Sequence, residues 1–431
     1  MWVSSILFGI NGFYEPIIYI HNILIILKEE SKMKENLLNV AVIGTGNCGG
    51  QMADLASGEG FDAIAINASA DDMEMLVNKV ECFLVGDGKG TGKNRENAKE
   101  YLHEHTAIFK DERIIKFITE HDVIVIASST GGGFGSGSSL ELTAILSEIY
   151  QDKLFIPTGV MPFNTEGYTA QNHGIEWEQE LESMQVPYIL YDNDRFSGKP
   201  EKEVCRIVNM NFINDLRIMR GDFIYETKTG GIDARDLLTT LSTPGRIVMG
   251  SLIDIDEEDV IDKSLIATLK KYIDEESAHA DVVDDKQIMA SAIMYCLPEE
   301  FDLYKGTIRS DLQNIYGEHI SDYTNFADIT DDNLKDVRPC VAVILSGLTT
   351  SQTRIGRMVK RRDKLVEGIT SRKAPESKVS KVDTAVADKL KLGAKSFGGT
   401  PTTNRVNVDQ VLSKFTGVST ITAPSSEKSK N

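Results

Sequence analysis

The stretch TGGGFGSGSS, residues 130–139, decides the fold, because five of the seven positions from 131 to 137 are glycine. It follows the β-branched run DVIVIASS and precedes LELTAILSEIY, whose apolar residues have helical spacing. Glycine tolerates the backbone angles of a strand-to-helix turn and leaves N–H groups open to a ligand. These N–H groups and the positive end of the following helix favour an anion. The segment therefore predicts a phosphate-binding loop rather than a flexible linker.

Strands and helices alternate on both sides of this loop, from residue 37 to residue 198. The apolar strand candidates are residues 37–44, 61–67, 81–85, 122–128, 153–159 and 186–192. Each is followed by a helical or glycine-rich segment, which predicts a mostly parallel α/β sheet with helices on both faces. Ligands of such sheets bind at the carboxyl ends of the strands, where the glycine loops lie.

Two further glycine loops follow predicted strands. GTGNCGGQ, residues 44–51, has the Gly-x-Gly-x-x-Gly spacing of dinucleotide-binding proteins. An NAD-binding fold would place an acid at the end of the second strand, but Asn67 stands there. GDGKGTGK, residues 86–93, lacks P-loop spacing. We interpret both as additional phosphate loops. An NAD-dependent oxidoreductase is the alternative from another class, although it leaves residues 131–137 unexplained.

Five segments, in this order along the chain, resemble the nucleotide loops of the tubulin/FtsZ family. They are GNCGGQ (46–51), GGGFGSGS (131–138), GVMPFNTEG (159–167), DNDRF (192–196) and GGIDARD (230–236). The resemblance implies a tubulin/FtsZ-like fold with a Rossmann-like GTP-binding domain, a long central helix and a smaller α/β activation domain. The implied bounds are 34–198, 199–220 and 221–350.

The resemblance also implies which residues bind GTP. These are Gly46, Asn47, Cys48, Gln51, Asn67, Gly88, Gly90, Gly131, Gly132, Gly133, Phe134, Gly135, Ser136, Gly137, Glu166 and Asn193. Among them Glu166 is expected at the ribose and Asn193 at guanine, although each could instead be an ordinary turn residue. Asp233 and Asp236 are expected to orient water at the γ-phosphate of a neighbouring subunit, and the alternative is a helix cap.

The chain departs from the family pattern at two places. The family usually has an acid two residues after the position of Asn67, and here that residue is Ser69. Asp71 is the candidate substitute for holding Mg²⁺. The aromatic residue that stacks on the base cannot be located at the start of the central helix, where Lys199 and Glu203 fall.

The charge is divided between an acidic body and a basic tail. The whole chain has a net charge of −19, whereas the part from Arg354 onward has 17 Lys and Arg against 7 Asp and Glu. Such a body repels nucleic acid, so contact with an anionic partner is expected in the tail. A basic helix is predicted for 351–371. Residues 372–431, poor in aromatics, are expected to be a disordered tail.

The cysteines and the first 33 residues indicate in which cellular compartment the protein is expected. Five scattered cysteines without a C-x-x-C motif predict reduced thiols in the cytoplasm. The N-terminal extension 1–33 is apolar, but polar residues interrupt it before the about 20 residues that a bilayer span needs. It lacks the basic region of a signal peptide. Three interpretations of this extension stay open: an over-extended start assignment, an extra packing helix and a membrane anchor. Among these, no membrane association is expected.

Within the family the glycine loops and the basic tail most resemble the plasmid- and phage-borne partition tubulins called TubZ. This resemblance implies a magnesium-dependent GTPase that polymerises head to tail and segregates plasmid or phage DNA. It also implies a small DNA-binding adaptor protein bound by the basic tail. A cell-division or phage-positioning tubulin like FtsZ, and a member that binds nucleotide without hydrolysing it, are the alternatives.

Overall fold

The structure is a computed structural model that describes part of the chain. The described residues are 37–78, 80–223, 232–253, 264–281, 288–296, 310, 324–327 and 340–370. The predicted extension 1–33 and the predicted tail 372–431 lie outside them, as do Gly230 and Gly231 of the segment GGIDARD.

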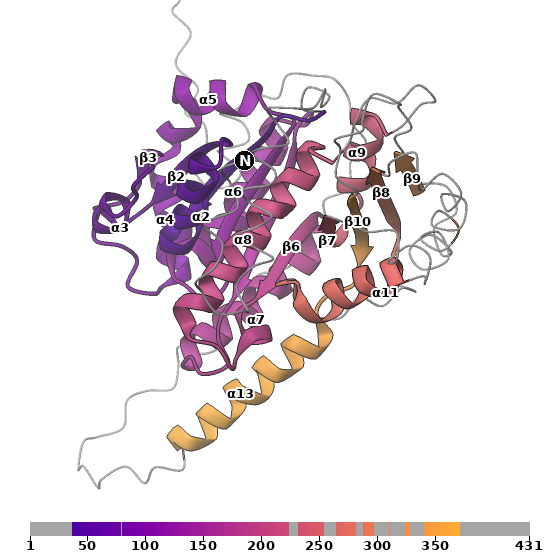
Figure 1. Cartoon of the computed structure of the whole chain (residues 1–431). Helices are drawn as coiled ribbons and strands as arrows, with labels where there is room; N and C mark the ends of the chain where they lie inside the picture. Colours follow the sequence, from indigo (N-terminus) through magenta and orange to yellow (C-terminus); the bar gives the residue numbers. More distant parts are fainter. Residues whose placement is uncertain are drawn as a thin grey trace, which may run out of the picture.

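The described strands form one sheet in the order β3-β2-β1-β4-β5-β6-β7-β10-β8-β9 (Figure 1). Strands β3 to β7 in that order pair in parallel, β10 is antiparallel to β7 and β8, and β9 is parallel to β8. The strand bounds are β1 Val40–Thr45, β2 Asp62–Asn67, β3 Glu81–Leu84, β4 Val123–Ser129, β5 Leu154–Met161, β6 Pro187–Asp192, β7 Gly245–Ile253, β8 Ala290–Cys296, β9 Thr324–Ala327 and β10 Cys340–Leu348. The predicted mostly parallel α/β sheet is confirmed.

Helices cover both faces of this sheet (Figure 1). One face carries α2 Gly46–Gly58, α8 Glu201–Arg220 and α9 Ala234–Leu241, and the other carries α4 Arg95–Glu104, α5 Glu112–Thr119, α6 Phe134–Ile149 and α7 Tyr168–Met184. The remaining described helices are α3 Ala70–Glu74, η1 Thr106–Lys110, η2 Asn193–Phe196, α11 Ser264–Lys271, η3 Tyr272–Glu276 and α13 Gln352–Thr370.

The central strands are apolar on both faces because each face packs against helices. Val42 and Val125 lie in the cluster with α2 and α8, whereas Ile43 and Ile126 lie in the cluster with α4, α5 and α6. Continuous β-branched runs of this kind are typical of strands buried in parallel sheets. Each fully buried side chain of this size contributes about 1.5–3 kcal/mol of hydrophobic stabilisation.

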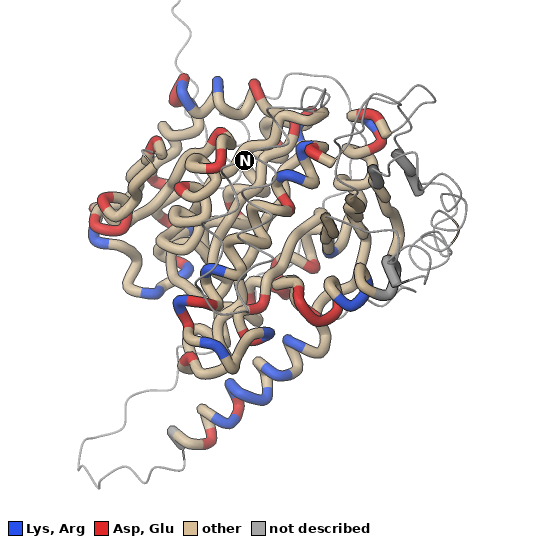
Figure 2. Tube along the Cα trace, in the orientation of Figure 1, with Lys and Arg blue, Asp and Glu red and all other residues tan. Residues whose placement is uncertain are grey.

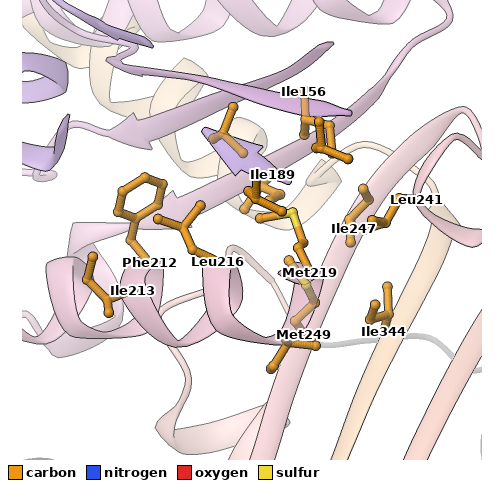
Figure 3. Packing of buried hydrophobic residues seen from close by; sticks show 14 of the residues in the cluster. Ile156, Ile189, Phe212, Ile213, Leu216, Met219, Leu241, Ile247, Met249 and Ile344 are labelled. Carbon is orange, nitrogen blue, oxygen red and sulfur yellow. The ribbon is translucent and has the colours of Figure 1, made fainter. Parts of the chain in front are cut away.

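The long helix predicted over 201–220 is confirmed as α8. It ends where Gly221 adopts a φ of 87°, and the N–H of Gly221 bonds back to the last turn. Its apolar face lies in one cluster with β5, β6 and β7, and Figure 3 shows Phe212, Leu216 and Met219 among these side chains. Helix α8 follows β6 along the chain. Its length therefore sets the distance between the turn after β6 and the elements at the far end of the helix.

The strands of the predicted activation domain continue the same sheet. Pro187, Tyr188 and Ile189 of β6 pair in parallel with residues 245–247 of β7. Helix α13 then packs along α7, with Met358 buried in a cluster that includes Trp177. No helix in the described part of the chain is both long and apolar enough to cross a membrane.

Candidate functional site

Two glycine loops meet backbone to backbone at the carboxyl edge of the sheet. A Cβ on Gly46, which has a φ of 69°, would lie 2.8 Å from the nitrogen of Gly135. A Cβ on Gly135 would lie 2.7 Å from the carbonyl oxygen of Thr45. These distances are shorter than real Cβ contacts, so the approach requires glycine at both positions. The first turns of α2 and α6 are thereby brought side by side.

Most glycines of the 131–137 loop fill a structural need. A Cβ on Gly133 would come within 2.5 Å of Thr91, and one on Gly137 within 2.4 Å of the Arg95 carbonyl oxygen. Gly132 differs, because a Cβ there would meet its nearest neighbour, Ser129, at 3.9 Å. Gly132 is therefore the loop glycine with open space on its side-chain side.

Two predicted contact residues of this loop turn their side chains inward. Phe134 is 6% exposed and lies in the apolar cluster of α4, α5 and α6. The Ser136 hydroxyl donates to the carbonyl oxygen of Gly132 at 2.5 Å. His173 also contacts that carbonyl through Nδ1 at 2.8 Å. Phe134 and Ser136 can therefore offer a ligand their backbone N–H groups, not their side chains.

The start of α2 carries a polar pair and a thiol. Gln51 Nε2 donates to Asn47 Oδ1 at 2.9 Å, and both side chains are exposed. The surrounding protein raises the pKa of the partly exposed Cys48 thiol to about 12, and nearby Cys205 and Glu166 add to the rise. Cys48 therefore stays neutral at physiological pH and marks the place where α2, α8 and the 159–167 loop meet.

The 86–93 loop is tied to the turn that follows β2. The N–H of Gly90 donates to the Ala68 carbonyl at 2.7 Å, and the Gly88 carbonyl accepts from Ala70 at 3.0 Å. Gly88 and Gly90 have φ values of 82° and 77°. Asn67 Oδ1 accepts the N–H of Ala68 at 2.8 Å and so holds the same turn. The N–H of Gly90 is thus already used within the protein.

The 159–167 loop and the 192–196 turn are joined by a hydrogen bond. The N–H of Asn164 donates to Asp194 Oδ1 at 3.1 Å. Within the loop, Glu166 Oε1 accepts the N–H of Phe163 at 2.8 Å. Asn193 Oδ1 is buried and has no hydrogen-bond partner in the described part of the chain. Since buried polar atoms are rarely left unpaired, Asn193 Oδ1 is an open acceptor for a ligand.

A buried ion pair that the sequence did not predict lies behind this turn. Arg354 Nε donates to Asp192 Oδ1 at 2.7 Å, and Arg354 Nη2 donates to the Pro162 carbonyl. Both charged side chains are fully buried. Arg354 belongs to the basic part of the chain that is expected to contact an anionic partner; that expectation is wrong for Arg354, whose charge lies inside the fold. The two partners lie far apart in the sequence, which gave no signal for the pair.

The predicted catalytic carboxylates lie away from the glycine loops. Helix α9 lies beyond the far end of α8, a helix of 20 residues and about 30 Å (Figure 1). Asp233 Oδ1 accepts the N–H of Asp236 at 2.9 Å, and Asp236 Oδ2 accepts the N–H of Asp233 at 3.2 Å. This is the helix-cap arrangement weighed as the alternative. Neither carboxylate can reach the glycine loops of its own subunit.

Candidate metal ligands at the glycine edge are few. The described residues contain no group of three or more His, Cys, Asp or Glu that could hold a metal ion. Asp72 Oδ2 accepts from Asn67 Nδ2 at 3.2 Å, whereas Asp71 on α3 is exposed. Near the expected position of the stacking aromatic, Lys199 forms a 3.0 Å ion pair with Glu203.

Comparison with known proteins gives one family and several relatives. Residues 39–199 match the profile described as Tubulin/FtsZ family, GTPase domain. The tubulin-like protein CetZ of Pyrococcus furiosus is 23% identical over 362 residues, which cover 81% of this chain and 96% of that protein. The tubulin-like protein TubZ of Clostridium botulinum C phage is 25% identical over 248 residues, covering 56% and 65%.

Solved structures give a matching fold. A GTPγS-form protofilament of Bacillus thuringiensis serovar israelensis TubZ superposes with a TM-score of 0.63 at 19% identity, covering 79% of this chain and 95% of that chain. The GDP-bound monomer of Haloferax volcanii CetZ1 gives 0.60 at 18% identity, covering 77% and 100%. At this identity the likeness establishes the fold alone.

Proposed function

We propose that the protein binds GTP, hydrolyses it and polymerises head to tail, from the premise that residues 39–199 match the GTPase domain of the tubulin/FtsZ family. The observation that carries the proposal is the backbone contact of Gly46 with Gly135, beside the open position of Gly132. Two helix N-termini side by side suit a chain of phosphates, because the N–H groups of their first turns favour anions.

The nucleotide's other groups also find suitable partners. Guanine carries N–H donors at its Watson–Crick edge, and Asn193 Oδ1 is a buried acceptor without a partner in the described chain. Glu166, expected at the ribose, lies close enough to Cys48 to raise the pKa of its thiol. The hydrogen bond from Asn164 to Asp194 links this ribose side to the base side. The donors and acceptors therefore fit a guanine nucleotide.

Magnesium fits the site as a hard cation held mainly by phosphate oxygens and water. Mg²⁺ bound beside nucleotides uses one or two carboxylates from the protein. The exposed carboxylate of Asp71 is the candidate, and Asp72 is its hydrogen-bonded neighbour. When bound, the ion would neutralise charge on the phosphates.

Hydrolysis requires a second subunit in this proposal. The N–H groups of residues 132–136 would stabilise phosphate charge, and Asp233 and Asp236 of a neighbouring molecule would orient the attacking water. Support comes from the position of α9 beyond the far end of α8, because a head-to-tail stack brings opposite ends together (Figure 1). Such a heterologous contact does not close and so forms filaments. A capping carboxylate keeps lone pairs for water.

We also propose that the filaments segregate plasmid or phage DNA, through a small DNA-binding adaptor held by the basic tail. The support is the division of charge, since Lys and Arg follow one another along α13 (Figure 2). The relatives include both TubZ and CetZ proteins, so this role depends on the tail rather than on the fold. Arg354 takes no part, because it is buried.

The nucleotide proposal is tested by thermal unfolding with GTP, GDP, ATP or NAD. GTP and GDP should raise the midpoint temperature, whereas ATP and NAD should not, because binding to the folded state alone stabilises it. Gly132→Leu should abolish the rise, since its side chain would enter the phosphate space, and Gly356→Leu on α13, also in open space, is the matched control. A rise with NAD alone would favour the oxidoreductase alternative.

A further inference from the structure

The first turn of α13 reaches into the two loops assigned to ribose and base. Arg354 bonds Asp192, the residue before Asn193, and also the carbonyl of Pro162 in the 159–167 loop. The side chain is 0% exposed, so both hydrogen bonds are shielded from bulk solvent. One guanidinium therefore ties both loops to a helix that begins more than 150 residues later in the sequence.

Three carboxylates from separate elements hold the start of α13. Glu178 of α7 accepts the N–H of Ser351 at 3.0 Å. Asp281 accepts the N–H of Arg354 at 3.2 Å, and Asp192 of β6 accepts from its side chain. Carboxylates at a helix N-terminus are stabilising, and those of Glu178 and Asp192 are buried, whereas Asp281 is partly exposed. The docking of α13 is thus built from polar contacts that depend on one another.

The space around this contact is not solidly packed. A cavity of about 460 Å³ lies between the 192–195 turn and the start of α13, and polar side chains line it. Arg357 lines this cavity and lies 3.1 Å from Asp192 while remaining 46% exposed. On the other side of α13, Ile355, Met358 and Val359 pack in the apolar cluster that includes Trp177. On the cavity side, the polar contacts of Arg354 therefore hold the turn in place.

We propose that Arg354 is a positioning residue for the base and ribose side of the nucleotide site, and that α13 docking and guanine-nucleotide binding strengthen each other through it. The inference rests on the proposed GTP site. The bond from Asn164 to Asp194 makes the two loops one unit, which Arg354 holds from behind. Thermodynamic linkage makes the effect reciprocal, so nucleotide must stabilise the docked helix by the same factor. The docking of α13, and with it the attachment of the tail that follows, would then depend on whether nucleotide is bound.

The test compares Arg354→Lys with Arg362→Lys on the same helix, whose side chain pairs with the adjacent Asp363. Lysine keeps the charge but lacks the planar fork that bridges Asp192 and the Pro162 carbonyl. Affinity for GTP should fall about tenfold, as expected for a lost hydrogen bond to a charged group. The ratio of ATP to GTP dissociation constants should fall as well. A purely structural defect would weaken both nucleotides equally and leave that ratio unchanged.

Hydrogen exchange at backbone amides gives a second measurement. GDP should slow exchange at the backbone amides of Ser351 and Arg354, and Arg354→Lys should remove that protection. Wild-type selectivity for GTP with an unchanged ratio in Arg354→Lys, or no slowing of exchange by GDP, would overturn the inference alone. Absence of guanine-nucleotide binding in the wild type would overturn the proposed function and this inference together.

Discussion

Gly46 and Gly135 touch through their backbones where the first turns of α2 and α6 meet at the edge of the sheet. The contact joins two loops that follow β1 and β4, which are neighbours in the sheet. Any side chain at either position would separate the helix N-termini that together favour phosphate. The fold and the proposed nucleotide site therefore depend on the same two residues.

Gly135→Ala should lower stability. Its Cβ would lie 2.7 Å from the Thr45 carbonyl, a backbone atom that cannot move cheaply. Overpacking of this kind costs about 1–3 kcal/mol. Gly132→Ala is the matched control, because its Cβ has no neighbour closer than 3.9 Å, and its free energy of unfolding in urea should stay near that of the wild type. Equal losses in both variants would show that the loop contact is not tight.

Asp236→Ala should separate binding from hydrolysis. The side chain lies far from the glycine loops, so GTP affinity should be unchanged, while phosphate release slows by roughly two orders of magnitude. Loss of half the capping box should also cost about 1 kcal/mol of stability. Asp236→Asn is the control, because it keeps a capping acceptor without the charge and should be stable yet slow. Unchanged turnover, or lost GTP binding, would contradict the assignment of this loop.

Glu178 should make stability depend on pH. Burial raises its pKa from 4.5 to about 7, so the folded protein holds the proton more tightly than the unfolded chain. The stabilisation is complete below about pH 4.5 and is lost as the pH rises through about 7. Glu178→Gln should therefore be more stable than the wild type at pH 8, by on the order of 2 kcal/mol.

At pH 5 the stabilities of Glu178→Gln and the wild type should converge. Urea unfolding between pH 5 and pH 8 measures the difference, with Glu182→Gln, an exposed position on the same helix, as the control. Parallel pH profiles for Glu178→Gln and the wild type would show that the carboxyl titrates without burial.

Truncation after Ile369 should leave filaments that no longer recruit a DNA-bound adaptor. The truncated chain keeps Arg354 and Met358, so α13 should still dock. Contacts of the lysine-rich tail should also weaken with salt in the full-length protein. Co-sedimentation with the adaptor and its DNA is the measurement. Undiminished recruitment would rule out the tail, and failure to form filaments would favour contact of the tail with a neighbouring subunit.

The local sequence pattern predicted the positions of several helices, strands and turns. The glycine run at 131–137 and the helix at 201–220 stand where the sequence placed them, because turn chemistry and helical spacing are local properties. Family resemblance supplied the order of the loops. It favoured TubZ over FtsZ, whereas the relatives similar to this chain include CetZ, TubZ and FtsZ proteins.

Side-chain direction and long-range pairing were beyond the sequence. Phe134 was expected at the nucleotide, yet its ring is in the core, because α4 and α5 provide an apolar pocket there. The N–H of Gly90 is used by Ala68, a contact that no spacing reveals. The pair of Asp192 with Arg354 depends on how α13 returns to the sheet. Pairs of this kind need the tertiary structure.

The central claim is nucleotide-dependent polymerisation, and sedimentation of the purified full-length protein with Mg²⁺ tests it most directly. The protein should pellet as filaments with GTP and stay in the supernatant with GDP, with ATP and without nucleotide, because the γ-phosphate of GTP would complete the joint between subunits. Equal pelleting, or none, in all four conditions would contradict the account.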